Sequence, residues 1–406
     1  MTIVVRNGLL IDGTGADPTA ATVSITADRF TEVGAPGAPL ARSDDVIDAD
    51  GLTLLPGLID LHTHMGVIDL TGSGRPSPAL LAAQLFENAE LCLLSGHTTA
   101  REVSGADGGL RQVIDAGVIP GPRLFPSGPM ISQSGGHGDH GSQWLDGHHG
   151  NTVIPGLIHT SVIVDGVDEM RRAARLAFKA GATQLKVCIS GGVVSFTDRL
   201  EDTQFSVEEL RAAVDEARAR DTYVTAHAHN ARAIENGLAA GLECFEHGTF
   251  LDEATVEKMA TSGAALVPTL SIPYLMASER EAWGIPEEIA ARLNGIEEAM
   301  TRSLKLAYDA GVLIGSGSDH LGPQQNRRGL EIARKAQALG PMAAIVSATS
   351  ASARILRRED LGVVAAGKTA DLIAVRGDPL ADPAVFDEPG NVVLVIKDGV
   401  VVKDTR

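Results

Sequence analysis

The middle of the chain repeats one pattern, in which a short apolar strand is followed by a helical stretch that ends in glycine just before the next strand. The pattern occupies about residues 57 to 358. Five junctions show the glycine clearly, in AGVIPGPRLFPS, KAGATQLKVCIS, AAGLECFEHG, TSGAALVPTLS and DAGVLIGSGSD. Glycine is the usual residue in the left-handed conformation that closes a helix. Repeated strand–helix units of this length predict an α/β fold with a parallel sheet.

Eight strands can be placed in this region. They are LIDLH (58–62), TTARE (98–102), RLFPS (123–127), QLKVCIS (184–190), YVTAHAH (223–229), CFEHG (244–248), ALVPTLS (265–271) and LIGSGSD (313–319). Eight units over about 300 residues match a (β/α)8 TIM barrel, whose chemistry lies at the carboxyl ends of its strands. A doubly wound sheet is the alternative, but no Gly-x-Gly-x-x-Gly motif opens a helix after the first strand. Ser206 and Glu209 predict a capping box at the start of one helix.

The two ends of the chain have a different pattern. Residues 2–55 alternate short β-rich runs with Gly, Asp and Pro, which is typical of a small antiparallel sheet. Strand-like runs reappear near the other end, in ADLIAVRGD and NVVLVIKDGVVVK. We therefore expect a small β-sandwich built from residues 1–56 and 359–406, with the barrel of residues 57–358 inserted between them.

Composition indicates a globular protein. The chain has 406 residues, of which 44% are hydrophobic and 21% charged. It has no apolar run of about 18 to 20 residues and its N-terminus lacks a signal pattern, so we expect a cytoplasmic protein without a membrane partner. The net charge of −18 argues against a nucleic-acid partner. Cys92, Cys188 and Cys244 lie far apart, which fits neither a disulfide framework nor a zinc ribbon. A homo-oligomer is compatible with the sequence.

Residue types that bind metals occur at the ends of the expected strands. His62 and His64 close the first barrel strand and share one face, because side chains two residues apart on a strand point the same way. An isolated pair of this kind is equally compatible with two histidines satisfied by hydrogen bonds. His227, His247 and Asp319, however, fall at the ends of strands five, six and eight. Imidazole is a common ligand of divalent zinc, cobalt and nickel, so the shared rim predicts a metal site.

Lys186 is the unusual member of this set. It lies in the fourth strand between Leu185 and Val187, where an unpaired ammonium is costly to bury. Reaction of the amine with carbon dioxide would give a carbamate, which is a carboxylate on a long stem that can bridge two metals. The alternative is a snorkelling or salt-bridged lysine. We expect the carbamate.

Several motifs resemble the metal-dependent amidohydrolase superfamily, particularly its imidazolonepropionase-like and Xaa-Pro dipeptidase-like branch. They are PGLIDLHTH, the lone strand-four lysine, VTAHAHN, ECFEHGT and GSGSDH, together with LGVVAAGKTADLIAV near the C-terminus. The resemblance implies two divalent metal ions, with zinc as the expected metal. It assigns His62, His64 and Asp319 to the first ion and His227 and His247 to the second, with the carbamate of Lys186 bridging both.

The chemistry of such a site is hydrolysis. Two metals about 3.5 to 4 Å apart can lower the pKa of a bridging water and polarise the scissile carbonyl. Asp319 could then take the proton from the bridging hydroxide and pass it to the leaving amine as a general acid. Its alternative role is the N-cap of the following helix. The predicted reaction is cleavage of a C–N amide bond, with a dipeptide or an N-acyl amino acid as the expected small-molecule substrate.

Further residues are candidates for contact with the substrate. His137 and His140 belong to the glycine-rich segment GGHGDHG, which can bring backbone close to a ligand. Xaa-Pro dipeptidase-like proteins have a similar histidine facing the substrate, so we expect His137 to assist catalysis by polarising the carbonyl or binding a carboxylate. His229 is either a substrate contact higher in the mouth or a solvated loop residue. Arg101 and Glu102 end the second strand. They are either a substrate anchor or a pair that supports the ligands from behind.

Three other functions would use the same fold or the same site. A mononuclear deaminase or an imidazolonepropionase-like hydrolase would have the same fold but generally does without the lysine bridge, and a non-catalytic scaffold would be expected to have lost ligands. A hydrolase of a non-peptide amide, carbamate, urea or lactone would keep the same site. Asp146, His148 and His149 are expected in a surface loop, with a further metal site as the alternative.

Overall fold

The computed structural model describes most of the chain. The described residues are 2–35, 45–68, 77–140, 152–195, 197–281, 283–285, 287–322 and 325–406. Within these ranges, no helix combines the length and the apolar character that crossing a bilayer requires.

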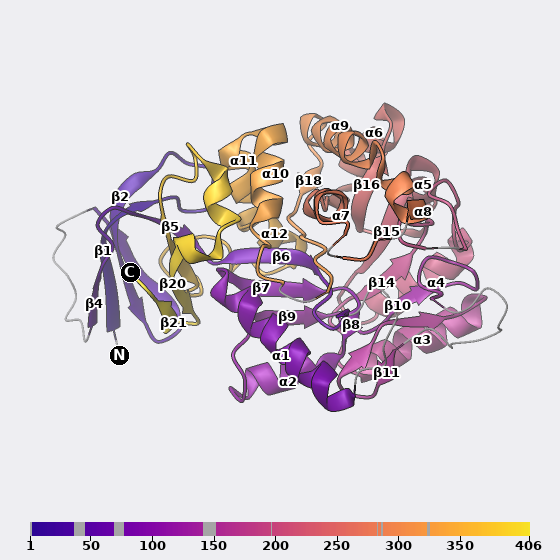
Figure 1. Ribbon diagram of the computed structural model, residues 1–406, viewed down its shortest axis with the longest axis horizontal. Coiled ribbons are helices and arrows are strands. Elements are labelled where there is room, and N and C mark those ends of the chain that lie inside the picture. The colour runs from indigo at the N-terminus through magenta and orange to yellow at the C-terminus, as the bar shows by residue number, and fades with distance from the viewer. Residues whose placement is uncertain are drawn as a thin grey trace.

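The two ends of the chain pair in one sheet. Its strand order is β21-β20-β19-β5-β1-β2-β3, and β4 also pairs with β1. In Figure 1 the indigo and yellow strands of this sheet lie together at one end of the molecule. The central pairing is antiparallel, between β5 and β19. The bounds are β1 Thr2–Leu10, β2 Thr19–Thr26, β3 Arg29–Gly34, β4 Asp45–Asp48, β5 Leu52–Pro56, β19 Leu372–Arg376, β20 Val392–Lys397 and β21 Val400–Asp404.

Eight parallel strands follow the segments expected from the sequence. They are β6 Leu58–Thr63, β7 His97–Glu102, β9 Arg123–Pro126, β14 Leu185–Cys188, β15 Val224–Asn230, β16 Cys244–Phe250, β17 Ala265–Val267 and β18 Leu313–Ile314. β6, β7 and β9 form one parallel sheet, and β14 to β18 pair in order within a second sheet that begins with β13 Ser161–Ile163 and β10 Met130–Ser132. The parallel α/β architecture is therefore confirmed.

Backbone hydrogen bonds also join the two parallel sheets. Thr183 donates to the carbonyl of Pro126 at 2.7 Å, just before β14 begins. On the other side, Leu61 donates to the carbonyl of Ser316 at 2.7 Å and Asp319 donates to that of His62 at 2.8 Å. The chain that follows the eighth strand thus lies beside the first strand, which brings Asp319 next to the histidines of β6.

Helices connect the strands, and Figure 1 shows them outside the parallel strands. Their bounds are α1 Pro78–Leu94, α2 Gly108–Asp115, α3 Val167–Lys179, α4 Val207–Arg218, α5 Ala231–Ala240, α6 Glu253–Ser262, α7 Ser271–Ser278, α8 Glu287–Leu293, α9 Ile296–Asp309, α10 Leu330–Leu339, α11 Pro341–Ser347 and α12 Ser350–Ile355. Short strands β8 Gly105–Ala106, β11 Val153–Ile154 and β12 Ile158–His159 form a separate antiparallel sheet, and 3-10 turns cover Pro383–Phe386 and Pro389–Asn391.

The helix boundaries confirm two local predictions. Ser206 and Glu209 form the capping box that opens α4, with both reciprocal hydrogen bonds present. The five glycines expected to end helices all have positive φ: Gly117, Gly181, Gly241, Gly263 and Gly311. Left-handed backbone of this kind is costly for most other residues, so these glycines set where each helix ends.

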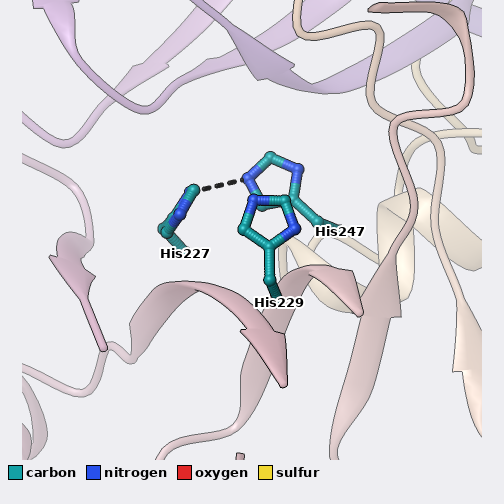
Figure 2. Close-up of side chains that lie close together, drawn as sticks. All are labelled: His227, His229 and His247. Carbon is teal, nitrogen blue, oxygen red and sulfur yellow. Dashed lines mark hydrogen bonds between the residues drawn. The ribbon is translucent and has the colours of Figure 1, made fainter. Parts of the chain in front are cut away.

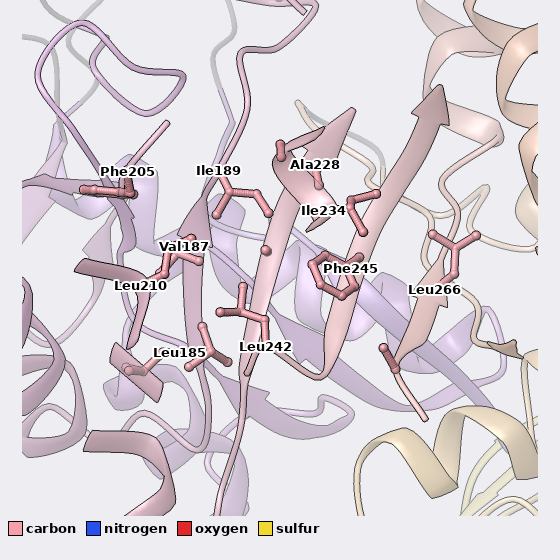
Figure 3. Close-up of a cluster of buried hydrophobic side chains, with 14 of the residues drawn as sticks. Leu185, Val187, Ile189, Phe205, Leu210, Ala228, Ile234, Leu242, Phe245 and Leu266 are labelled. Atoms are coloured by element: carbon pink, nitrogen blue, oxygen red, sulfur yellow. The ribbon is translucent and has the colours of Figure 1, made fainter. Parts of the chain in front are cut away.

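The core between strands and helices decides which way the β14 side chains point. Leu185, Val187 and Ile189 are fully buried in the largest apolar cluster, with residues of α4 and α5 (Figure 3). Burying a large apolar side chain contributes about 1.5 to 3 kcal/mol. Because side chains alternate along a strand, packing these three residues toward the helices turns Lys186 to the opposite face.

A partly buried ion pair connects the end sheet to the parallel strands. Arg123, at the start of β9, donates to the carboxylate of Asp371 at 2.6 Å. Asp371 precedes β19 and also accepts a hydrogen bond from Thr98 at 2.9 Å. The pair joins residues of the terminal segment to the strands that carry the candidate site.

Candidate metal centre

Two groups of potential metal ligands lie at the carboxyl ends of the parallel strands. One group is His62, His64 and Asp319, and the other is His227, His229 and His247. Within each group the ligand atoms all lie within 4.8 Å of one another. Figure 2 shows the second group, with His227 and His229 reaching the site from β15 and His247 from β16.

In the first group, the Nε2 atoms of the two histidines and Oδ1 of Asp319 lie close together. Nε2 of His62 lies 3.1 Å from Nε2 of His64, and Oδ1 of Asp319 lies 3.4 Å and 3.2 Å from these atoms. The opposite ring nitrogens have partners: Nδ1 of His64 is 2.8 Å from the carbonyl of Ser104, and Nδ1 of His62 is 2.7 Å from Oε2 of Glu246. Because both partners are acceptors, each Nδ1 carries a proton, and in the neutral ring Nε2 is the nitrogen left to bind a metal.

The second group surrounds His247. Its Nε2 lies 2.9 Å from Nδ1 of His227, and its Nδ1 lies 2.8 Å from the hydroxyl of Thr269. The ring of His229 stacks on that of His247 at 4.8 Å between centroids, and its Nδ1 is 2.7 Å from the hydroxyl of Thr249. Every histidine of this group is buried.

Electrostatics favours the neutral, metal-binding form of most of these rings. Burial, with added repulsion from neighbouring imidazoles, holds the pKa of His227 and His247 well below the ordinary value. Burial also lowers the pKa of His62, and that of His229 to about 4. His64 differs: burial lowers its pKa, but the hydrogen bond and the charge of Asp319, together with Glu102 and the carbonyl of Ser104, outweigh burial and raise it. A neutral imidazole is the form that binds a metal ion.

Two of the candidate ligands have left-handed backbone. φ is 67° at His247 and 54° at Asp319. Consecutive residues of a regular strand point to opposite faces, yet Glu246 and His247 both reach the interior, where they contact His62 and His227. Positive φ at His247 allows this. Such backbone costs of order 1 to 3 kcal/mol and is concentrated at functional sites.

Lys186 is the residue whose surroundings most need an explanation. It is 2% exposed, and its Nζ has no hydrogen-bond partner among the described residues. Burial lowers the pKa of the amine, although the carboxylate of Glu246 acts in the other direction. A buried amine without a partner in the described part of the chain, beside buried imidazoles and the carboxylate of Asp319, is compatible with a site for divalent metal.

Arg101 lies below the histidines rather than at the rim. It is fully buried, and it donates to Oε1 of Glu246 at 2.6 Å, to the carbonyl of Leu61 at 2.6 Å and to the hydroxyl of Tyr223 at 3.1 Å. Of the two roles that the sequence leaves open, a substrate anchor needs an accessible guanidinium, so the buried position corrects that assignment and favours a supporting role behind the histidines.

Glu102 is not the partner of Arg101 either. Its carboxylate accepts hydrogen bonds from the hydroxyl of Thr63 at 2.6 Å and from the backbone of Met65 and Ala106. It therefore braces the turn that follows β6, immediately after the ligand His64.

The glycine-rich segment brings His137 against the second ligand group. Its ring stacks on that of His227 with 3.9 Å between centroids. A Cβ added to Gly192 would lie 2.1 Å from Nδ1 of His137, so this approach requires glycine there. His140 is exposed, and its ring centroid lies 6.5 Å from that of His137. Asp146, His148 and His149 lie outside the described residues.

Two buried carboxylates of the site were not singled out in the sequence. Oε2 of Glu246 contacts His62, and Arg101 holds its pKa well below the ordinary value although burial alone would raise it. Asp60 accepts hydrogen bonds from the backbone of His62 and Ser318, and Arg328 donates to it at 2.9 Å. The available signal was a charged residue inside an otherwise apolar strand, because a buried charge needs a partner.

Comparison with known proteins agrees with this arrangement. The sequence model that describes the amidohydrolase family matches residues 53–402 of this chain. Ochratoxinase from Aspergillus niger is 34% identical over 364 residues, which cover 86% of this chain and 75% of that protein. A prolidase structure with bound N-methylphosphonate-L-proline has a TM-score of 0.91 and 35% identity, with all of both chains covered. A Xaa-Pro dipeptidase with bound methionine in its active site has a TM-score of 0.89 and 30% identity, over 99% of this chain and 100% of that one. The chain therefore belongs to the amidohydrolase family and is a hydrolytic enzyme that acts on C–N bonds.

Proposed function

We propose that this enzyme is a binuclear metal-dependent amidohydrolase that cleaves the amide bond of dipeptides or N-acyl amino acids. The observation that carries the proposal is the pair of adjacent candidate ligand groups, with the amine of Lys186 nearby and no hydrogen-bond partner for it among the residues that the structure describes. We further propose that the eight parallel strands form a (β/α)8 barrel and that the paired ends form its β-sandwich. The carboxyl ends of barrel strands are where such a site belongs.

The ligands divide between two ions. His62, His64 and Asp319 would hold one, and His227 and His247 would hold the other, with zinc as the proposed metal for both. Lys186 would bridge them as a carbamate: its neutral amine forms a bond to the carbon of carbon dioxide and releases a proton. Its burial supports this step, because burial lowers the pKa of the amine and so favours the neutral form. When bound, the two ions would activate water and polarise the substrate carbonyl.

Asp319 would move the proton in the proposed reaction. Burial alone would raise the pKa of its carboxyl, but His62 and His64 prevail and lower it, so that it is ionised at neutral pH. Its side chain is 13% exposed and therefore more accessible than that of His62. In the proposed reaction Asp319 accepts a proton from the attacking water and gives it to the amine that leaves.

The substrate would lie against the open side of the histidines. His137 stacks on His227, and His140 is exposed in the same segment. We assign these two residues, with His229, to substrate recognition. His229 also belongs geometrically to the second ligand group, but Lys186 completes that group in our proposal. The relatives support an amide substrate, since a prolidase with a proline-containing ligand is among them.

A matched pair of substrates tests the proposal. Dipeptides and N-acyl amino acids would be assayed beside the same compounds with the C-terminal carboxylate converted to a carboxamide. We expect the free acids to be hydrolysed with a higher kcat/KM. If only uncharged amides, carbamates, ureas or lactones react, the amino-acid part of the proposal is wrong, and a metal-dependent hydrolase of another substrate remains.

The proposed location is the cytoplasm. Cys92, Cys188 and Cys244 are free and buried, and all three lie within the described residues. Unpaired cysteines are typical of proteins in a reducing compartment.

A further inference from the structure

We infer that Glu246 is a positioning residue for the first group of metal ligands. Its carboxylate would fix the ring orientation and tautomer of His62, so that Nε2 of His62 is available to a metal. Arg101 would hold that carboxylate in place. The inference rests on the proposed metal site but not on the substrate class.

The two oxygens of Glu246 have separate partners. Oε1 accepts from Arg101 at 2.6 Å and from the hydroxyl of Thr225. Oε2 lies 2.7 Å from Nδ1 of His62. Neutralising Arg101 requires only the first of these contacts. The second therefore needs its own explanation, and a metal-binding histidine commonly donates its other N–H to a carboxylate in this way.

Burial makes the arrangement specific. Arg101 and Glu246 are both 0% exposed, and His62 is 1% exposed. Without water to replace a lost acceptor, the Nδ1 proton of His62 has few alternatives to Oε2. Arg101 is fixed in turn by the carbonyl of Leu61, which is the residue before His62. The guanidinium thus ties the carboxylate to the same strand that carries the ligand.

Glu246 also connects the two ligand groups through the chain. It precedes His247, a member of the second group, while its side chain holds His62 of the first. The left-handed backbone of His247 lets the side chains of Glu246 and His247 both face the interior. His64 gives an internal comparison, because its Nδ1 is held by the backbone carbonyl of Ser104 and needs no side chain. His62 therefore depends on a side chain that substitution can remove.

The test removes the acceptor without leaving a buried charge unpaired. Arg101→Met with Glu246→Leu replaces the pair with apolar groups, which is often neutral or stabilising. Arg101→Met with Glu246→Gln keeps an acceptor oxygen for His62. Metal affinity would be measured by competition with a chelator, for zinc and for cobalt, together with the visible spectrum of the cobalt protein. We expect the Leu variant to bind one of the two ions about 10- to 100-fold more weakly, and the Gln variant to recover part of that loss.

A second readout uses the protein without metal. Nitrogen-15 NMR of labelled histidine distinguishes the tautomers, and we expect His62 to be protonated at Nδ1 in the wild type and in the Gln variant but to lose this preference in the Leu variant. Asp371→Asn is the control, because it weakens a partly buried ion pair with another arginine, Arg123, away from the candidate ligands. It should lower stability and leave metal affinity unchanged.

The outcomes separate the possibilities. Wild-type metal affinity in the Leu variant, or equal affinity in the Leu and Gln variants, would overturn the inference and reduce Glu246 to the counter-ion of Arg101. If metal affinity falls equally in the Asp371→Asn control, the inference is also overturned, because metal affinity would then merely follow the stability of the protein. A wild-type protein that binds no metal would instead refute the proposed function, and the tautomer measurement would still decide whether Glu246 sets His62.

Discussion

Oδ2 of Asp319 lies 3.9 Å from Nδ1 of His247, while Oδ1 of the same carboxylate lies 3.2 Å from Nε2 of His64. One side chain thus contacts both groups of ligands. Its backbone and that of His247 are both left-handed. In the proposed function this carboxylate, between two clusters of buried imidazoles, would bind a cation and exchange a proton beside it.

Metal analysis should return about two divalent ions per chain, with zinc as the expected metal. The reason is the presence of two adjacent ligand groups. Elemental analysis of the purified enzyme would measure the content, and a chelator should remove metal and activity together. One ion or none in a fully active preparation would contradict the binuclear site.

Lys186→Ala should lose metal and activity together, because it removes the proposed bridge. Short carboxylates added to the variant should restore part of both. Metal content and turnover are the measurements. Lys335→Met is the control, since Lys335 is also fully buried but donates to the carbonyl of Gly315 and the hydroxyl of Ser347. The control should keep both ions. A fully metallated, active Lys186→Ala enzyme would rule out the bridge.

Asp319→Asn should lower kcat by several orders of magnitude. The amide cannot accept the proton in the proposed reaction, and it is a weaker ligand beside His62 and His64. Turnover would be measured at saturating metal, so that weak binding of the ion is separated from the lost proton transfer. Near-wild-type turnover would leave Asp319 with only a structural role.

His137→Asn should reduce kcat/KM by about 10- to 1000-fold, equivalent to roughly 1.4 to 4 kcal/mol of transition-state binding. His137 stacks on His227 but is not a member of either ligand group. Metal content should therefore stay unchanged. Kinetics on a dipeptide and on its carboxamide would show whether the loss is specific to the free acid. An equal loss on both would favour a role in polarising the carbonyl over one in binding the carboxylate, whereas a variant that loses metal would contradict the assignment.

His97 should make stability depend on pH. Burial lowers its pKa from 6.5 to about 4, so the folded state binds its proton less readily than the unfolded state. The stability associated with neutral His97 is complete above pH 6.5 and is lost as the pH falls toward 4. Between pH 7 and pH 5 the loss in the free energy of unfolding due to His97 amounts to about 2 kcal/mol. Urea unfolding of wild type and His97→Asn at both values would test it. The same change with pH in both proteins would exclude His97 as the source.

Local rules were sufficient for the strand positions and for the ligand candidates. The alternation of side chains on a strand, the glycines after helices and the capping box of Ser206 and Glu209 all depend on neighbours along the chain, so they can be read without knowing the fold. The position of Lys186 between two apolar residues is likewise a feature of neighbours along the chain. Its two neighbours pack against the helices, and the lysine must then face the interior.

The partners of buried charges are a different matter, because they come from other strands. The sequence places Arg101 at the end of a strand and so predicts a position at the rim, but its guanidinium reaches Glu246, 145 residues away, and Tyr223, 122 residues away. No pattern near Arg101 contains that information. The left-handed backbone of His247 likewise follows from the need to place two consecutive side chains in one interior. Sequence could name the candidate ligands of this site, whereas the residues that hold those side chains in place depend on contacts made only when the strands come together.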